Sequence, residues 1–397
     1  MNKHIVNILM MLLSWTMVAG ASADPPADAP SQKHPDAAED NTSIIGNRHS
    51  RRQLFERETF GGNGRTCLTC HGRKSGTAAP EEAQNRFSAN PADPLFVHDG
   101  SDDGHGHGVE RILEHATILV EIPLPPNVRL ADDPTARSVT LRRGIPTTLN
   151  TPALDPILML DGRDPDLESQ ALGAIHAHFQ NTEEPSEEDL RQLAEFQQTS
   201  RFFSSPILRK FAHGGPPPEL PQGYTDSEKR GRLFFEDRPL ASPDQKAGAC
   251  AVCHSGPMLN QTNQFFPVPV PPGSRFQSVA VSELNAMGNP VRDFIFTNPD
   301  GSETLVRSPD PGRALITGDA QSPFFDSVNA FKIPSLWGVR RTAPYFHDNS
   351  AKTLEAVAAH YAKFFALIST PPGGGDPALV LTEQDQADIV AYMKLLD

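Results

Sequence analysis

The stretch that decides the fold is Cys67-Leu68-Thr69-Cys70-His71, because Cys-x-x-Cys-His is the attachment signal for c-type haem. The two thiols can form thioethers to one porphyrin, and the histidine can ligate the iron as its proximal ligand. The pattern recurs once, at Cys250-Ala251-Val252-Cys253-His254, and the two copies contain all four cysteines. A single zinc site built from two CxxC pairs is the alternative, but it needs no histidine after each pair. The sequence therefore predicts two covalently bound haems c.

Length and composition set the fold class that we expect. A chain of 397 residues is long enough for two domains of ordinary size. Its 38 prolines favour short helices joined by long loops, so we expect a mainly α protein of two cytochrome c-like haem domains. The formal net charge of -14 argues against nucleic acid or an anionic membrane surface as a partner.

The N-terminus has the features of a secretory signal peptide. Lys3 precedes the apolar run 5–18, and Ala21-Ser22-Ala23 suits cleavage, so residues 1–23 are the predicted signal peptide. An uncleaved membrane anchor is the alternative, although the run is short for a membrane span. Residues 24–45 are rich in Pro, Ala and Asp and predict a disordered leader. We expect a periplasmic protein that, once processed, is not integral to the membrane.

A break between two similar halves sets the domain boundary that we expect. Gly214-Gly215-Pro216-Pro217-Pro218 is the strongest break, so we predict haem domains at 46–215 and 216–397. In each half a short amphipathic helix, near 51–60 or from Thr225, precedes the CxxCH motif. Glycines at 61–64 predict a close backbone approach to the first haem edge.

Two histidines lie on a predicted helix that begins near Asp164-Pro165-Asp166, with Asp164 as N-cap and Pro165 at the first helical position. Helical periodicity places His178 on the apolar face and turns His176 away from it. A histidine on such a face is often only a core residue. Beside a haem, it is also a candidate distal acid or base, because its pKa lies nearest neutral pH. We expect His178 to have that role ahead of His176, the second candidate.

The loop at 97–107 contains three aspartates, three histidines and three glycines. Carboxylates and imidazoles in one loop can bind a divalent metal. The spacing fits no EF-hand, and a solvated flexible loop is the preferred interpretation.

The last part of the chain predicts two helices. In the first, Leu354, Ala358, Tyr361 and Phe365 share an apolar face that leaves His360 outside it. Thr382 begins the second helix as its N-cap.

These features together resemble the bacterial di-haem cytochrome c peroxidase family, including its MauG-type branch. The resemblance covers both haem motifs, Asp161-Gly162-Arg163, the stretch 331–337 and the stretch 342–353. It implies that His71 holds the peroxidatic iron, while His254 holds the iron through which electrons enter.

Three departures from the family pattern affect the expected chemistry. Tyr361 stands fourteen residues past His347, where peroxidases of the family carry a methionine ligand and the MauG branch a tyrosine. Leu160 replaces the family's tryptophan between the haems, and a glutamate expected near Gln180 is absent. Because that glutamate is absent, His178 becomes the main candidate for the acid–base group at the first haem.

Tyr361 is therefore the predicted sixth ligand of the second haem iron. Phenolate favours ferric and higher iron states, whereas methionine raises the potential. The alternative is a core tyrosine whose hydroxyl donates to a backbone carbonyl. Met287 and Met393 are rival ligands, and Met258 is too close to His254 to reach the opposite haem face.

The resemblance also implies a calcium ion between the domains. Its ligands would include the backbone carbonyls of Thr342 and Pro344. Gly144 stands where the family has an asparagine, which removes one ligand side chain.

Four functional hypotheses follow. The first is an exported enzyme that reduces hydrogen peroxide with electrons from a small c-type cytochrome or cupredoxin. The second is MauG-like oxidation of side chains in a partner protein. The third is a non-catalytic di-haem electron carrier, which needs a second strong ligand at each iron. The fourth is an oxygenase, because more distant di-haem oxygenases share parts of these motifs.

Overall fold

A computed structural model describes residues 50–239, 246–266, 270–369 and 379–397. The predicted signal peptide and the leader up to residue 45 lie outside the described residues. Residues 51–397 form one compact unit, and the division predicted at Gly214 remains a prediction. Among the described residues, no helix combines the length and apolarity that crossing a membrane requires.

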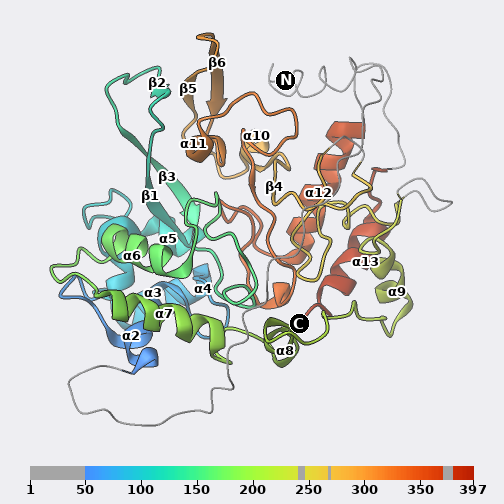
Figure 1. The fold of residues 1–397 in the computed structure, drawn as a ribbon, viewed down its shortest axis with the longest axis horizontal. Coiled ribbons are helices and arrows are strands. Elements are labelled where there is room, and N and C mark those ends of the chain that lie inside the picture. Colours follow the sequence, from blue (N-terminus) through green and yellow to red (C-terminus); the bar gives the residue numbers. More distant parts are fainter. Residues whose placement is uncertain (1–49, 240–245, 267–269, 370–378) are drawn as a thin grey trace. The chain divides into compact units, whose positions relative to one another are not determined.

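The described chain is mostly helical, as the sequence predicts (Figure 1). In the first half the helices are α2 (Arg51–Arg57), α3 (Cys67–Cys70), α4 (Pro80–Ala89), α5 (Glu110–His115), α6 (Leu167–His178), α7 (Glu187–Thr199) and α8 (Pro206–Ala212), with 3₁₀ turns η1 (Pro94–Phe96) and η2 (His98–Gly100). In the second half they are α9 (Asp226–Leu233), α10 (Val281–Leu284), α11 (Ala314–Thr317), η3 (Val339–Arg341), α12 (Leu354–Ser369) and α13 (Glu383–Met393).

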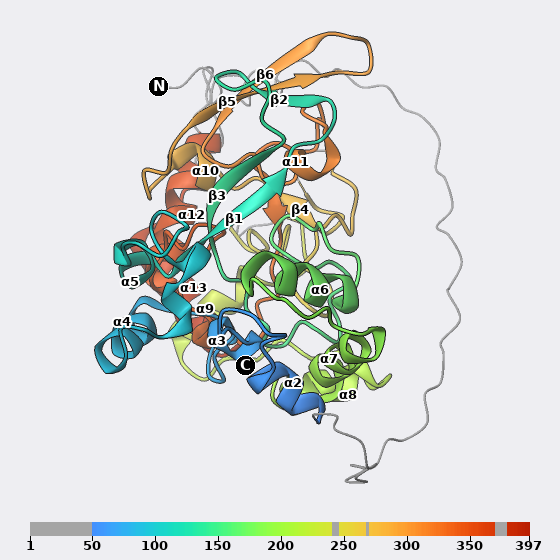
Figure 2. The ribbon, with the colours of Figure 1, turned by 90° about the vertical axis from the view of Figure 1, so that its left-hand side faces the viewer.

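Three small antiparallel sheets accompany the helices. Their strands are β1 (Thr117–Pro123), β2 (Val128–Leu130), β3 (Ser138–Gly144), β4 (Phe276–Gln277), β5 (Arg292–Thr297), β6 (Glu303–Ser308) and β7 (Phe331–Lys332). β1 pairs with β3 in a register that sets Thr117 opposite Gly144. β2 joins the β5–β6 hairpin (Figure 2). β4 pairs with β7. Because β2 precedes residue 216 and β5 follows it, the two predicted halves share a sheet.

Helix starts agree with the sequence except at α6. Thr225 and Thr382 form capping boxes with Glu228 and Asp385, as predicted. The N-cap of α6 is Asp166, whose side chain accepts from the amide of Ser169, so the prediction of Asp164 as cap is wrong. An acid at either position can accept an amide hydrogen bond, and the sequence alone does not choose between them.

Each CxxCH segment lies against its own apolar cluster. Around the first, Phe55 contacts Phe203 edge to face at 5.1 Å between centroids, within a cluster drawn from α2, α6 and α7. Around the second, α12 and α13 share a core with Trp337 and with Phe234 and Phe235, which directly follow α9. α9 and α13 pack closely at Gly231, where an added Cβ would lie 2.0 Å from the carbonyl oxygen of Asp388.

Candidate haem sites

The first CxxCH segment forms one short helical turn with its histidine just beyond it. His71 Nδ1 donates to the carbonyl oxygen of Gly76 at 2.9 Å, which leaves Nε2 for an iron. Burial lowers the pKa of His71, so the ring is neutral, as ligation requires. Burial, with the neighbouring thiol, raises the pKa of Cys67 to about 12, and burial also raises the pKa of Cys70.

The second segment has the same local arrangement. His254 Nδ1 donates to the carbonyl oxygen of Leu259 at 2.8 Å, again five residues further along the chain. Burial lowers the pKa of His254 and raises those of Cys250 and Cys253 to about 12. Two buried thiols and one neutral, oriented imidazole are the donor set that a covalent haem c uses. Both sites therefore fit the group.

A cavity of about 110 Å³ adjoins the first site. Cys70 and His71 contribute to its lining. Arg143, Arg163 and Lys332 line it too, and such cations suit the two carboxylates of a haem.

His178 lines the same cavity as His71, at the C-terminal end of α6. Its Nδ1 lies 2.5 Å from Asp99 Oδ2, and Asp99 Oδ1 accepts from Arg65 Nη1 at 2.5 Å. Burial favours the neutral form of Asp99, but its hydrogen bond to His178 and its ion pair with Arg65 lower its pKa overall. The cavity thus has one imidazole backed by an ionised acid.

His176 points away from this cavity, as helical periodicity predicts. Its side chain is 48% exposed, and its Nε2 lies 2.8 Å from Glu184 Oε2. His176 is therefore a poor candidate for chemistry at the first haem.

Tyr361 lies half-buried on α12, close to the second pair of thiols. Burial and then the charges of Cys253 and Cys250 raise its pKa. Its hydroxyl makes no hydrogen bond within the described residues, whereas Tyr345 donates to Val339 O at 2.8 Å and Tyr392 donates to Pro221 O at 3.0 Å. The carbonyl bond expected of a core tyrosine is thus seen at Tyr345 and Tyr392 and not at Tyr361.

The neighbour His360 is more buried than expected, and the methionines remain alternative ligands to Tyr361. His360 is half-buried, like Tyr361, and its Nε2 bonds to Val279 O at 2.8 Å. The prediction that His360 lies outside the buried face is wrong, because a loop distant in sequence covers it. Met258 and Met393 are buried in the same apolar cluster, and Met287 is half-buried outside it.

Aromatic and charged groups fill the region after β3 and around β7. Trp337 Nε1 donates to Pro257 O at 2.8 Å, in the loop that follows His254. Phe331 stacks on His347 with ring centroids 3.7 Å apart. Buried Arg143 pairs with both Asp161 and Asp310. These contacts hold the second site's loop and the cavity wall of the first site in a defined arrangement.

The calcium site between the domains remains a prediction that rests on the family resemblance. The described residues contain no group of three or more His, Cys, Asp and Glu that could hold a metal. A calcium ion there would therefore depend on carbonyl oxygens such as those of Thr342 and Pro344. Beside Gly144, the space for a side chain is filled by Asn349, whose Nδ2 donates to the carbonyls of His115 and Ala116.

Two residues that sequence reasoning missed are Asp99 and Arg65. Asp99 lies in the predicted flexible loop, but the structure buries it in η2 beside α6. Gly62, in the glycine turn, lies against the backbone oxygen of Phe179, and the approach of this turn to the first haem edge stays a prediction. The turn thereby sets Arg65 against the end of α6. The only sequence signal was the proximity of an arginine to the motif.

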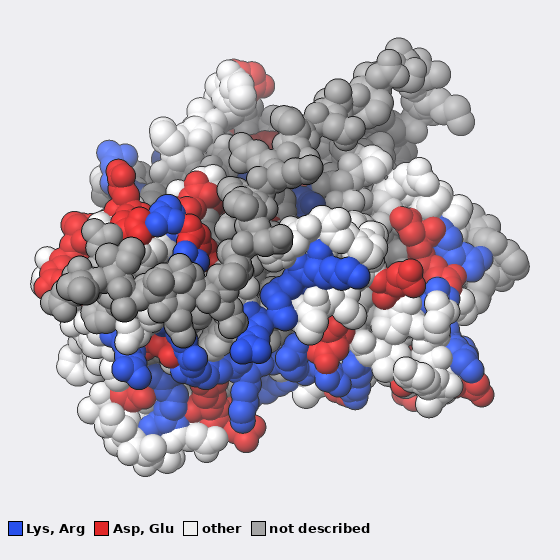
Figure 3. All heavy atoms as spheres, turned by 60° about the horizontal axis from the view of Figure 1, so that its bottom comes forward, with Lys and Arg blue, Asp and Glu red and all other residues white. Residues whose placement is uncertain are grey.

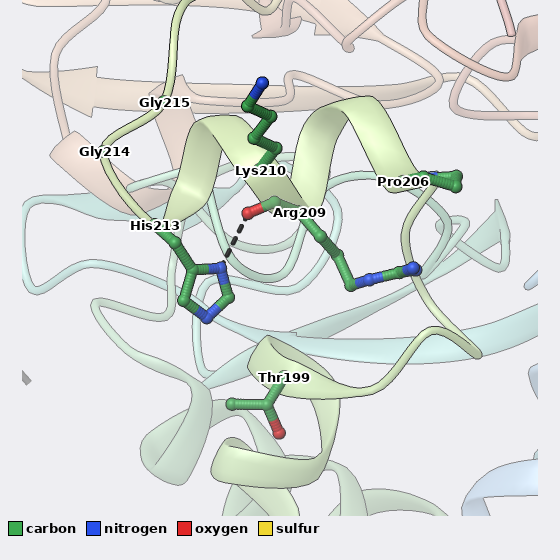
Figure 4. Close-up of a pocket in the computed structure, with 7 residues that line it drawn as sticks. All are labelled: Thr199, Pro206, Arg209, Lys210, His213, Gly214 and Gly215. Carbon is green, nitrogen blue, oxygen red and sulfur yellow. Dashed lines mark hydrogen bonds between the residues drawn. The ribbon is translucent and has the colours of Figure 1, made fainter. Parts of the chain in front are cut away.

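A separate surface hollow lies beside α8 (Figure 4). Its lining includes Arg209, Lys210 and His213, and His213 Nδ1 bonds back to Arg209 O at 2.7 Å. None of its residues belongs to a CxxCH motif, so it is not part of either haem site.

The chain has c-type cytochrome relatives. The cytochrome-c peroxidase IdrP1 of Denitromonas iodatirespirans is 29% identical over 153 residues, 38% of this chain and 37% of that protein. The cytochrome c551 peroxidase of Nitrosomonas europaea is 25% identical over 53% of this chain and 55% of its own length. The methylamine utilization protein MauG of Methylophilus methylotrophus is 25% identical over 66% of this chain and 70% of its own length. No family model matches the sequence.

Solved structures are similar at a lower level. A MauG-like protein associated with microbial copper homeostasis is 20% identical, with a TM-score of 0.47 and coverage of 89% of this chain and 91% of that one. The diheme peroxidase BthA from Burkholderia thailandensis is 16% identical, with a TM-score of 0.43 and coverage of 87% and 84%. The similarity to di-haem proteins therefore rests on the sequence relatives and the two motifs.

The motifs and the donor sets define a c-type protein with two covalently bound haems. In sequence the chain is similar to di-haem cytochrome c peroxidases and to MauG. The matches cover only 37% and 55% of the lengths of the first two relatives. They therefore do not carry over the activity, substrates or partners of those proteins.

Proposed function

We propose that this protein is an exported periplasmic oxidoreductase that reduces hydrogen peroxide at the His71 haem. Electrons would enter through the His254 haem from a small c-type cytochrome or cupredoxin. The observation that carries the proposal is the placement of His178 in the cavity that His71 lines. An acid–base group beside an iron is what cleavage of the O–O bond requires.

The haem, when bound, supplies one-electron redox chemistry and an iron that can take an oxygen ligand. The chain supplies the movement of protons. His178 Nδ1 is engaged by Asp99, so Nε2 can accept a proton from one peroxide oxygen and return it to the oxygen that leaves as water. Overall, one peroxide, two protons and two donor electrons give two waters.

Other residues orient the reacting groups. Arg143, Arg163 and Lys332 line the cavity and can pair with the haem carboxylates. Arg143 is held by Asp161 and Asp310, and Lys332 by Asp155 at 2.8 Å. Fixed cations lose little freedom on binding, so they would hold one ring orientation relative to His178.

A basic surface supports a partner of opposite charge. The face in Figure 3 carries a band of Lys and Arg side chains, although the whole protein has a net charge of -14. α8, with Arg209 and Lys210, lies on the side of Figure 1 that this view brings forward. A donor with an acidic surface would be steered to such a face.

The deciding experiment measures spectra and peroxide turnover of the purified two-haem protein. The donor is a reduced small c-type cytochrome or cupredoxin, and turnover is followed by donor oxidation. We expect ligand exchange at one haem and turnover that depends on both. Two permanently six-coordinate low-spin haems without turnover would overturn the proposal in favour of an electron carrier.

A second candidate is MauG-like oxidation of a partner protein. The absence of a hydrogen-bond partner for the Tyr361 hydroxyl within the described residues favours it, because a ligating phenolate supports higher iron states. Leu160 weakens it, since an aromatic bridge is missing there. The test adds peroxide to the protein with a small exported protein encoded alongside. Oxidised Trp or Tyr in that partner, found by mass spectrometry, would decide for this candidate.

A further inference from the structure

The imidazole of His178 contacts the buried carboxylate of Asp99, and that carboxylate pairs with the buried guanidinium of Arg65. Arg65 donates to Asp99, and Asp99 contacts His178, with both contacts at 2.5 Å. The side chains are 1%, 7% and 16% exposed in that order. Only His178 of the three lines the cavity, so the series ends at the cavity that His71 also lines.

We propose that Asp99 is a positioning residue that holds His178 as a proton acceptor facing the cavity, an inference that rests on the proposed function. An ionised carboxylate only accepts hydrogen bonds, so Nδ1 must carry the proton of the neutral ring. Nε2 is then the unprotonated nitrogen, free to take a proton from a ligand in the cavity.

Arg65 keeps Asp99 ionised and in place. Its guanidinium donates to Asp99 and also to the carbonyl oxygens of Pro94 at 2.9 Å, Leu95 at 3.1 Å and Val97 at 2.6 Å. These bonds tie the segment before Asp99 to the residue two before Cys67. The acid that orients His178 is therefore anchored to the haem-attachment segment itself.

Cyanide isolates the proton step from redox chemistry. Hydrogen cyanide must give its proton to a base as the cyanide anion enters the iron position, and His178 Nε2 would be that base. Carbon monoxide carries no proton, so its association with the reduced protein reports access alone. Comparing the two ligands separates proton acceptance from the shape of the cavity.

The test measures cyanide and carbon monoxide association rates at the first haem in the two-haem protein. For Asp99→Asn we expect the cyanide rate to fall about 100-fold, within the usual ~10²–10⁴ range of general acid–base contributions. An asparagine can turn its NH₂ toward Nδ1, which favours the tautomer with the proton on Nε2. The carbon monoxide rate should stay as in the wild type, and the pH profile for cyanide should change shape.

A double-mutant cycle shows whether Asp99 acts through His178. In a His178→Gln background, Asp99→Asn should add no further loss of cyanide rate. Glu184→Gln is the matched control, since Glu184 contacts the exposed His176, and it should leave both rates unchanged. Asp99→Glu keeps an acid acceptor but displaces it by one methylene, and should give a smaller loss confined to cyanide.

Each outcome has one meaning. An equal loss for both ligands at every pH, in Asp99→Asn or in Asp99→Glu, makes Asp99 merely structural and overturns the inference. Wild-type cyanide rates in Asp99→Asn overturn it too, while an intact peroxide reaction leaves the proposed function standing. If the wild type binds neither ligand and turns over no peroxide, the proposed function fails first, and this inference falls with it.

Discussion

The two haem-attachment sites are alike near the histidine and unlike everywhere else. In both, the histidine donates through Nδ1 to a carbonyl five residues further on, Gly76 in one and Leu259 in the other. The first site opens on a cavity with charged walls. The second is enclosed by an apolar cluster that contains Trp337 and Tyr361.

The difference teaches where reactivity is decided. A motif of five residues orients the proximal ligand through local hydrogen bonds. Other segments surround the rest of each site, α6 and η2 at the first and α12 at the second. The first site thus has a histidine beside its cavity, and the second has a tyrosine beside its thiols.

The largest expected effect is that of His178→Gln at the first site. Loss of the acid–base group should lower peroxide turnover by about 10²–10⁴-fold. The spectrum of the second haem should not change. His176→Gln is the control, because His176 is exposed and bonds to Glu184. Comparable turnover in both variants would remove the functional contrast between the two sites.

Tyr361→Phe tests the second site. If the phenol oxygen ligates the second iron, the variant should open that position or recruit another ligand, and the spectrum of that haem should change. The first haem should keep its spectrum. Tyr345→Phe is the matched control, because the Tyr345 hydroxyl already has Val339 O as its partner. A folded Tyr361→Phe protein with both spectra unchanged would show that Tyr361 only packs.

A change of glycine to alanine should lower the free energy of unfolding beside the second site and raise it beside the first. Gly231→Ala forces a Cβ to within 2.0 Å of Asp388 O, between α9 and α13, and should destabilise by about 1–3 kcal/mol. Gly173→Ala on α6 meets only Asp164 Oδ1 at 3.9 Å and should stabilise by about 0.5–1 kcal/mol. Urea unfolding measures both, and a shared sign would contradict the packing described for α9 and α13.

The smallest effect concerns acid stability at the first site. The folded-state pKa of Asp99 is lowered, so its stabilisation is present above the unfolded pKa of about 3.9 and is lost as the pH falls through the folded value. Asp99→Asn should therefore reduce the slope of unfolding free energy against pH below about pH 4. Urea midpoints across that range check this, and an unchanged slope would show that Asp99 is not coupled to folding.

The sequence by itself determined the number and position of the haem-attachment sites, because all the groups concerned lie within five residues. It also determined which histidine of α6 faces the cavity, since helical periodicity separates His178 from His176. The capping boxes at Thr225 and Thr382 were likewise readable, because a cap and its partner are three residues apart.

Only the tertiary structure decided what surrounds those groups. Asp99 and His178 are 79 residues apart, and Arg65 and Asp99 are 34 apart. No periodicity links such positions, so a loop that looked solvated became the buried support of an imidazole. The same reason explains the half-buried His360 and the Asn349 side chain beside Gly144. Local patterns set local geometry, whereas the partners of a buried polar group are chosen by packing between distant segments.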